Sequence, residues 1–231
     1  MPTTAVFFDV DFTLIYPGPT FDGDGYRRFA ERHGLEVDSS VFSAAVASAS
    51  VELNRAQDDI YQPELFIRYA RHVLELMGGA GPGLDPCALE IYEEWAACQH
   101  FSLYDDVQAT LEQLHAEGIR IGLISNTHRC LASFQSHFEL EPYISAALSS
   151  SDHGYMKPHP SIFEAALKLL DARSTESVMV GDSMNHDIRG ARQVGMKGVL
   201  IERSATSDSE TLNGVRVIRT LTELPEALQG L

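Results

Sequence analysis

The sequence predicts an α/β fold, in which helices cover a parallel sheet and an all-helical segment is inserted after the first strand. Two observations support this prediction. From about residue 104 onward, short apolar runs typical of buried strands alternate with segments of helical periodicity. Between about residues 20 and 100, apolar side chains recur at helical spacing without a strand pattern. We therefore expect a Rossmann-like core of residues 1–15 and 101–231 and a helical domain of residues 16–100.

The first strand is the apolar run at residues 5–8, and a turn rich in proline and glycine follows at 16–19. Within the helical domain, the pattern predicts a helix that includes residues 26–30 and three more at 39–56, 62–77 and 85–98. The polar residues at 38–40 are typical of a helix start.

The second part of the chain alternates regularly between the two kinds of element. Strands are expected at 119–124, 144–149, 177–180, 198–201 and 215–218. Helices are expected at 104–117, 128–138, 160–171, 186–194 and 222–229. Strands and helices in this order predict a parallel sheet covered on both faces.

The overall composition argues against some classes of function. A formal net charge of −16 is unsuited to nucleic-acid binding, so no nucleic-acid partner is expected. No apolar run approaches the about 20 residues of a membrane-spanning helix, and no basic leader precedes the first strand, so no membrane partner is expected. The three cysteines have no metal-binding spacing, which favours reduced thiols and a cytoplasmic protein.

Polar side chains follow three of the predicted strands. Because ligands of parallel sheets bind beyond the carboxyl ends of the strands, these side chains are candidates for one site. They are Asp9, Asp11 and Thr13 after the first strand, Ser125 and Asn126 after the second, and Asp182 with Asp187 further on. Lys157, the first lysine of the chain, lies in a loop just before a helix.

The spacing of Asp9 and Asp11 places two carboxylates close together, where they repel each other. Such a pair needs a metal ion, a cationic side chain or a shared proton. Phosphoryl transfer to a carboxylate fits this set of residues, because aspartate can act as a covalent nucleophile. Two unit charges about 4 Å apart repel by roughly 4 kcal/mol at an effective dielectric near 20, so Mg²⁺ and a lysine would be needed beside the phosphate. Mg²⁺ prefers oxygen ligands, which suits Asp9 and Asp182.

The chain resembles the haloacid dehalogenase superfamily of hydrolases, and the resemblance covers essentially its whole length. All four motifs of that family occur in order. They are Asp9-Val10-Asp11-Phe12-Thr13, then Ser125 with Asn126 at a strand end, then Lys157-Pro158, then Gly181-Asp182-Ser183 with Asp187 downstream. Within the family, the layout is most similar to the REG-2-like and other small-phosphatase branches.

The resemblance implies a role for each matching residue. Asp9 would be the nucleophile and Asp11 the general acid and base, with Lys157 completing the catalytic set. Asp9, Asp182 and the main-chain carbonyl of Asp11 would hold Mg²⁺, with Asp187 supporting the metal site or Lys157. Thr13, Ser125, Asn126 and Lys157 would bind phosphate. The implied activity is hydrolysis of a small phosphorylated metabolite through an aspartyl-phosphate, with residues 16–100 as a cap that selects the substrate.

Three alternatives remain open. A 2-haloacid dehalogenase uses the same nucleophile but lacks the second acid of the first motif, so Asp11 argues against it. A sugar phosphomutase of this family uses a cap lysine, and residues 16–100 contain none. A non-catalytic binding protein would be expected to have lost a motif acid.

Many relatives also have glycine at the position of Phe12, which affects substrate access more than the reaction. Tyr16, Phe21, Arg55 and Arg68 are further candidates for substrate recognition.

Overall fold

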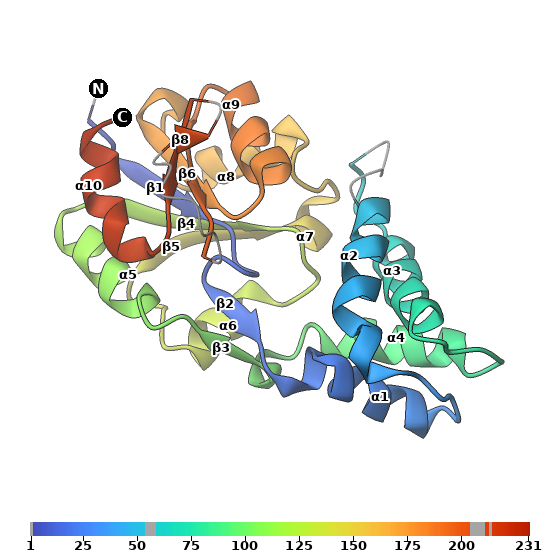
Figure 1. The fold of residues 1–231 in the computed structure, drawn as a ribbon. Coiled ribbons are helices and arrows are strands. Elements are labelled where there is room, and N and C mark those ends of the chain that lie inside the picture. The colour runs from blue at the N-terminus through green and yellow to red at the C-terminus, as the bar shows by residue number, and fades with distance from the viewer. Residues whose placement is uncertain (1, 54–58, 204–210, 213) are drawn as a thin grey trace. The chain divides into compact units, whose positions relative to one another are not determined.

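The computed structural model describes residues 2–231 except 54–58, 204–210 and 213 (Figure 1). The chain forms two compact units. Unit 1 consists of residues 1–16 and 103–231, and unit 2 consists of residues 17–102. Among the described helices, none is long and apolar enough to cross a membrane.

Unit 1 is built on a sheet that has seven strands in the described part of the chain, in the order β5-β4-β1-β6-β7-β9-β8. Neighbouring strands are parallel except at the β8–β9 pair. The strands are β1 (Ala5–Phe8), β4 (Arg120–Ser125), β5 (Ile144–Ser149), β6 (Ser177–Gly181), β7 (Lys197–Ile201), β8 (Thr211–Leu212) and β9 (Val215–Ile218). The predicted α/β class with a mostly parallel sheet is therefore confirmed, and β8 is an addition that the sequence pattern did not indicate.

Helices lie on both faces of this sheet, with α5 and α10 on one side and α8 and α9 on the other (Figure 1). The helices of unit 1 are α5 (Val107–Ala116), α6 (Leu131–His137), α7 (Ser150–His153), α8 (Pro160–Leu169), α9 (Gly190–Gln193) and α10 (Leu224–Gln229). A π-helical turn, η5 (Met184–Arg189), leads directly into α9, where one continuous helix was expected. Single 3₁₀ turns occur at η4 (Ser174–Glu176) and η6 (Leu221–Glu223).

The register of the sheet explains why the motif residues meet. All four residues of β1 are fully buried, as expected for a central strand covered on both faces. Phe8 lies level with Leu123 of β4 and with Val180 of β6. These three strands consequently end at the same edge of the sheet, and the residues that follow them converge there.

Unit 2 is helical, as its apolar periodicity predicts. It contains α1 (Gly23–Arg32), α2 (Phe42–Leu53), α3 (Pro63–Leu76) and α4 (Leu84–Glu94), with 3₁₀ turns η1 (Pro19–Phe21), η2 (Ser39–Val41) and η3 (Cys98–His100). The expected end of the second of these helices at residue 56 lies outside the described residues. Phe21 is buried among the rings of Phe29, Trp95 and Phe101, so it belongs to the core of this unit.

A two-stranded sheet of β2 (Ile15–Pro17) and β3 (Phe101–Leu103) was not predicted from the sequence. It lies where the chain passes from one unit to the other and back. The amide of Gly18 donates a hydrogen bond to the carbonyl of His100 at 2.7 Å, and the amide of Tyr104 donates one to the carbonyl of Leu14 at 3.0 Å. The inserted segment therefore leaves and rejoins the core through two paired strands.

Candidate active site

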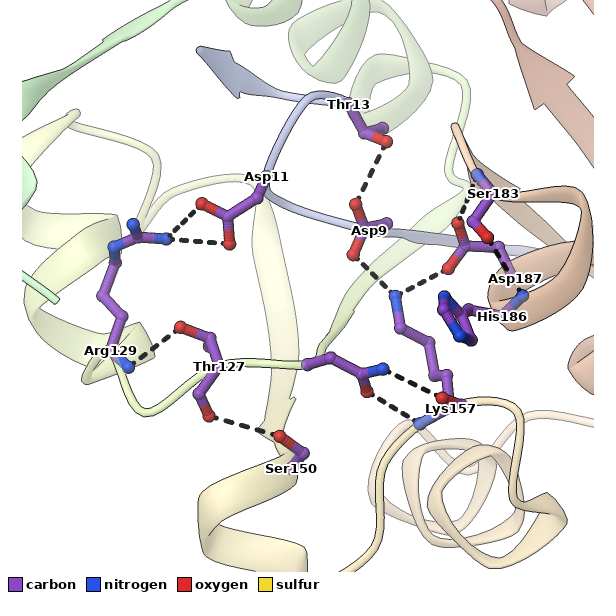
Figure 2. A network of polar contacts seen from close by, with 11 residues as sticks. Asp9, Asp11, Thr13, Thr127, Arg129, Ser150, Lys157, Ser183, His186 and Asp187 are labelled. Atoms are coloured by element: carbon purple, nitrogen blue, oxygen red, sulfur yellow. Dashed lines mark hydrogen bonds and ion pairs between the residues drawn. The ribbon is translucent and has the colours of Figure 1, made fainter. Parts of the chain in front are cut away.

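Asp9 and Lys157 form the centre of the candidate site. Nζ of Lys157 lies 2.6 Å from Oδ1 of Asp9 and 2.6 Å from Oδ1 of Asp187 (Figure 2). All three side chains are buried. A single ammonium group thus bridges two carboxylates that come from different strand ends of the sheet.

Two further contacts orient Asp9. Its backbone amide donates to the carbonyl of Val180 at 2.9 Å, which extends the β1–β6 ladder by one residue. Its Oδ2 accepts a hydrogen bond from the Thr13 hydroxyl at 3.2 Å. The Asp9 carboxylate is therefore held on one oxygen by Thr13 and on the other by Lys157.

Thr13 lies in the loop after β1 and is held in place by a residue from another part of unit 1. Its carbonyl accepts a hydrogen bond from Nη2 of Arg203 at 2.8 Å. Arg203 also contacts both carboxylate oxygens of Asp106, at 2.9 and 3.0 Å, and stacks over the Tyr104 ring at 3.6 Å. The loop after β1 is thus tied to residues that are far away in the sequence, which local patterns could not reveal.

Lys157 is positioned through its backbone by Asn126. The Asn126 side chain accepts a hydrogen bond from the Lys157 amide at 2.7 Å and donates one to the Lys157 carbonyl at 2.9 Å. The peptide bond between Lys157 and Pro158 is cis. Both the oxygen and the nitrogen of the Asn126 side-chain amide are therefore engaged by the Lys157 backbone.

Asp187 is held rigidly behind Lys157. Its Oδ2 accepts a hydrogen bond from the Ser183 amide at 2.9 Å. A Cβ atom at Gly181 would lie 2.3 Å from Cγ of Asp187, so only glycine allows the carboxylate to approach the end of β6 this closely. Both oxygens of Asp187 are therefore occupied by protein donors.

Asp9, Asp182 and Asp187 form an acidic cluster, since each offers one ligand atom within 4.8 Å of the others. The sequence-based metal set was Asp9, Asp182 and the main-chain carbonyl of Asp11. The structure brings Asp187 into the cluster and turns the Asp11 side chain elsewhere. Burial of the Asp182 carboxylate raises its pKa to about 8, and repulsion from Asp9 and Asp187 contributes a smaller part of this rise. The Asp182 residue as a whole is nevertheless exposed to solvent. A divalent cation would relieve this crowding, and carboxylate oxygens are ligands that suit Mg²⁺.

The Asp11 side chain points away from Asp9 toward Arg129, a residue that the sequence analysis did not identify (Figure 2). Nη1 of Arg129 lies 3.0 Å from Oδ1 and 3.2 Å from Oδ2 of Asp11. Burial raises the pKa of Asp11, and the Arg129 charge opposes that rise. For Asp9, burial likewise raises the pKa and Lys157 opposes the rise.

Arg129 was missed because a helix was expected to begin at residue 128. The helix α6 begins only at Leu131, and residues 126–130 form a loop. One signal could have indicated its role, namely that a cationic residue follows closely after the strand-end residues Ser125 and Asn126.

Ser125 and Phe12 complete the set of motif residues. The Ser125 hydroxyl is buried without a hydrogen-bond partner among the described residues, so it is available for a ligand oxygen. Phe12 has a φ of 63°, in the left-handed region that favours glycine, and the residue is 45% exposed. Glycine at this position would adopt the same backbone conformation without strain.

The other recognition candidates come from both units of the chain. Tyr16 is exposed in unit 1 with its ring 4.9 Å from that of Tyr104. Arg68 is exposed on α3 of unit 2 and Phe21 is buried in that unit, while Arg55 lies outside the described residues. Each of the remaining candidates, Asp9, Asp11, Thr13, Ser125, Asn126, Lys157, Asp182 and Asp187, belongs to unit 1.

The family model for haloacid dehalogenase-like hydrolases matches residues 3–195. The chain belongs to this family. A ribulose-1,5-bisphosphate 5-phosphatase of Halopiger xanaduensis is 34% identical over 213 residues, which cover 89% of this chain and 87% of the relative. A glyceraldehyde 3-phosphate phosphatase of Methanothermobacter thermautotrophicus is 29% identical, over 97% of this chain and 99% of the relative.

Solved structures of the haloacid dehalogenase-like family share the fold. A phosphatase of this family from Thermococcus onnurineus superimposes with a TM-score of 0.66 at 25% identity, over 99% of each chain. The family membership expected from the four motifs is thereby confirmed.

Proposed function

We propose that this hydrolase cleaves small phosphomonoesters by forming an aspartyl-phosphate on Asp9. The observation that carries the proposal is the buried Asp9–Lys157–Asp187 arrangement, with both distances to Nζ at 2.6 Å. It places a nucleophilic carboxylate next to a fixed positive charge. An ammonium group has three N–H donors, and two are used here, which leaves a third for a phosphate oxygen.

In the first step, an oxygen of Asp9 attacks phosphorus while the bond between phosphorus and the alcohol oxygen breaks. Asp11 gives a proton to the departing oxygen, so that the alcohol leaves neutral. In the second step, water attacks the phosphorus of the aspartyl-phosphate, and the Asp11 carboxylate takes a proton from that water. Inorganic phosphate leaves and the Asp9 carboxylate is restored.

We assign phosphate binding to four groups of unit 1. They are the Ser125 hydroxyl, the main-chain N–H of Asn126, the Lys157 ammonium and, next to Asp9, the Thr13 hydroxyl. The Ser125 hydroxyl supports this assignment most directly, since a buried donor without a protein partner is costly unless a ligand satisfies it. Together these donors would hold the phosphoryl oxygens while Asp9 reacts.

Asp9, Asp182 and the main-chain carbonyl of Asp11 are proposed to hold Mg²⁺. When bound, the cation would neutralise charge on the phosphoryl oxygens. The donor set is made of oxygen atoms alone, and burial together with repulsion from Asp9 and Asp187 raises the pKa of Asp182, an effect that a bound cation would oppose. Asp187 is proposed to support Lys157, since its Oδ1 accepts from the Lys157 ammonium group and its Oδ2 from the Ser183 amide.

Residues 17–102 are proposed as the cap that selects the substrate, with residues 1–16 and 103–231 as the catalytic core. The phosphatases similar to this chain are named for a pentose bisphosphate and a triose phosphate. Small sugar phosphates are therefore the substrate class that we propose for this chain. A 2-haloacid dehalogenase would have no use for Asp11, which is present here with its own buried counterion.

The experiment is a panel of sugar phosphates and 2-chloropropionate, assayed with Mg²⁺ and with EDTA, for the wild type and Asp9→Asn. We expect phosphate release from at least one sugar phosphate, loss of that activity in EDTA, and no turnover by the variant. Full activity of Asp9→Asn would rule out covalent catalysis by Asp9. Halide release without phosphate release would instead support the dehalogenase.

A further inference from the structure

Arg129 is buried as completely as any side chain in the core, although it carries a permanent positive charge. Burying a charge is unfavourable unless a partner of opposite charge accompanies it. Here the partner is Asp11, whose two carboxylate oxygens lie 3.0 and 3.2 Å from Nη1 of Arg129. The Asp11 side chain is 17% exposed and the Arg129 side chain is fully buried, so the arginine approaches Asp11 from the protein interior.

The loop that carries Arg129 is itself well anchored. The Arg129 amide donates to the Thr127 hydroxyl at 3.0 Å. The Thr127 carbonyl accepts from the Ser151 amide at 3.2 Å and from the Ser150 hydroxyl at 3.4 Å, which ties the loop to α7. Arg129 therefore presents its guanidinium group from a fixed backbone.

The same loop also positions Lys157, because Asn126 makes both hydrogen bonds to the Lys157 backbone. Residues 126–129 consequently direct two separate cations to two separate acids. Lys157 is directed to Asp9, and Arg129 is directed to Asp11.

We propose that Arg129 is a positioning residue for catalysis. It holds the Asp11 carboxylate apart from Asp9, in the place where Asp11 exchanges protons with the alcohol and with water. This inference rests on the proposed function and deepens it. When Asp11 passes its proton to the departing alcohol, a carboxylate remains in a buried place, and Arg129 supplies the charge that accompanies it. Arg129 touches neither the phosphate nor the alcohol in this account, and it acts only through Asp11.

The test uses the dependence of the first step on the leaving group. An alkoxide is a poor leaving group and needs a proton, whereas p-nitrophenolate leaves without one. Leaving-group release is measured in a single turnover of enzyme with Mg²⁺, using p-nitrophenyl phosphate and the best sugar phosphate of the panel. The variants are Arg129→Met, Arg129→Lys, Asp11→Asn and the double variant Asp11→Asn with Arg129→Met. Arg173→Met, which removes an exposed arginine paired with Glu176, is the matched control.

We expect Arg129→Met to slow sugar release by about 10²-fold and nitrophenol release by less than about tenfold, in line with the usual contribution of a general acid. Arg129→Lys should recover part of the loss, because one cationic nitrogen can still approach both oxygens. In the Asp11→Asn background, Arg129→Met should cause no further loss. The Arg173→Met control should match the wild type with both substrates.

Equal losses with the two substrates, or losses that multiply in the double variant, would overturn the inference and leave Arg129 with a structural role alone. If Arg129→Met does not fold, Arg129→Lys and the double variant, which carries no unpaired charge, supply the same comparisons. Failure of the proposed function would look different, because the wild type would then release no phosphate or Asp9→Asn would remain active.

Discussion

The carboxylates of Asp9 and Asp11, two residues apart, are paired with different buried cations. Lys157 lies 2.6 Å from Asp9, and Arg129 lies 3.0 Å from Asp11. Figure 2 shows the two acids pointing in different directions from the loop after β1. The two buried cations thus reduce the charge repulsion between the acids even without a bound metal ion.

Replacing Lys157 with Met should reduce both activity and stability. The change leaves two buried carboxylates, Asp9 and Asp187, without their shared cation. Breaking a buried ion pair in this way costs about 3–5 kcal/mol in unfolding free energy, and loss of the charge beside the phosphate should slow turnover by about 10²-fold or more. Urea unfolding and steady-state kinetics measure the two effects.

The matched control for this change is Lys168→Met, which removes an exposed lysine on α8. It should alter unfolding free energy by less than about 0.5 kcal/mol and leave turnover unchanged. If Lys157→Met were as stable and as active as this control, the ammonium group would not be neutralising the two acids.

Replacing Asp182 with Asn should abolish stabilisation by Mg²⁺. A ligand that binds only the folded state raises stability by about 2.7 kcal/mol at a concentration 100 times its Kd. The wild type should therefore melt at a higher temperature in Mg²⁺ than in EDTA, and Asp182→Asn should melt at the same temperature in both. Differential scanning fluorimetry is sufficient, and it requires no substrate.

Asp152→Asn is the matched control, since Asp152 belongs to unit 1 but lies outside the acidic cluster. This variant should keep the response to Mg²⁺. A wild type that shows no shift over a wide range of Mg²⁺ concentrations would contradict the assignment of the cluster as a metal site.

The strand ends of the core were predictable because parallel sheets bring their carboxyl ends to one edge. Asp9 and Asp182 each follow a strand, and Ser125 is the last residue of one. Arg129 and Arg203 were not predictable from the same pattern. Their partners, Asp11 and Asp106, lie far away in the sequence, and the contacts arise only when separate loops meet. The direction of the Asp11 side chain and the approach of Asp187 to Asp9 and Asp182 were not predictable for the same reason, because a side chain's direction depends on its tertiary partners.

Phe12 offers a test of backbone strain in the loop after β1. Its left-handed conformation costs a residue with a side chain about 1–2 kcal/mol, and glycine avoids this cost. Phe12→Ala removes the ring but keeps the strain, so it is the matched control for Phe12→Gly. We expect the glycine variant to unfold at higher urea concentration than the alanine variant, by about 1 kcal/mol in free energy. Equal stability of the two variants would show that the loop relaxes without cost.

Glu90 links two helices of unit 2 and should make this unit sensitive to acid. It contacts Nη2 of Arg32 at 2.6 Å and Nε2 of His33 at 2.6 Å. Partial burial pushes the pKa of Glu90 up, but the hydrogen bonds from Arg32 and His33 lower it overall. A carboxyl whose pKa is lowered by folding stabilises the folded state above its unfolded pKa, and this stabilisation is lost as pH falls through the folded value.

Glu90→Gln should therefore cost about 1 kcal/mol or less at pH 7, and the difference from the wild type should shrink below about pH 4. Urea unfolding at several pH values gives the comparison. Glu112→Gln, at an exposed position of α5, should show no such convergence. A difference that stays constant with pH would mean that the Glu90 charge contributes nothing.

The most direct test of covalent catalysis by Asp9 is detection of phosphate on this residue. The Mg²⁺-loaded enzyme is mixed with the best substrate of the panel, quenched in acid within a turnover and digested for mass spectrometry. We expect a transient phosphate on the peptide that contains Asp9, absent from Asp9→Asn and discharged as turnover ends. Phosphate release at full rate without phosphorylation of this peptide at any quench time would contradict this expectation.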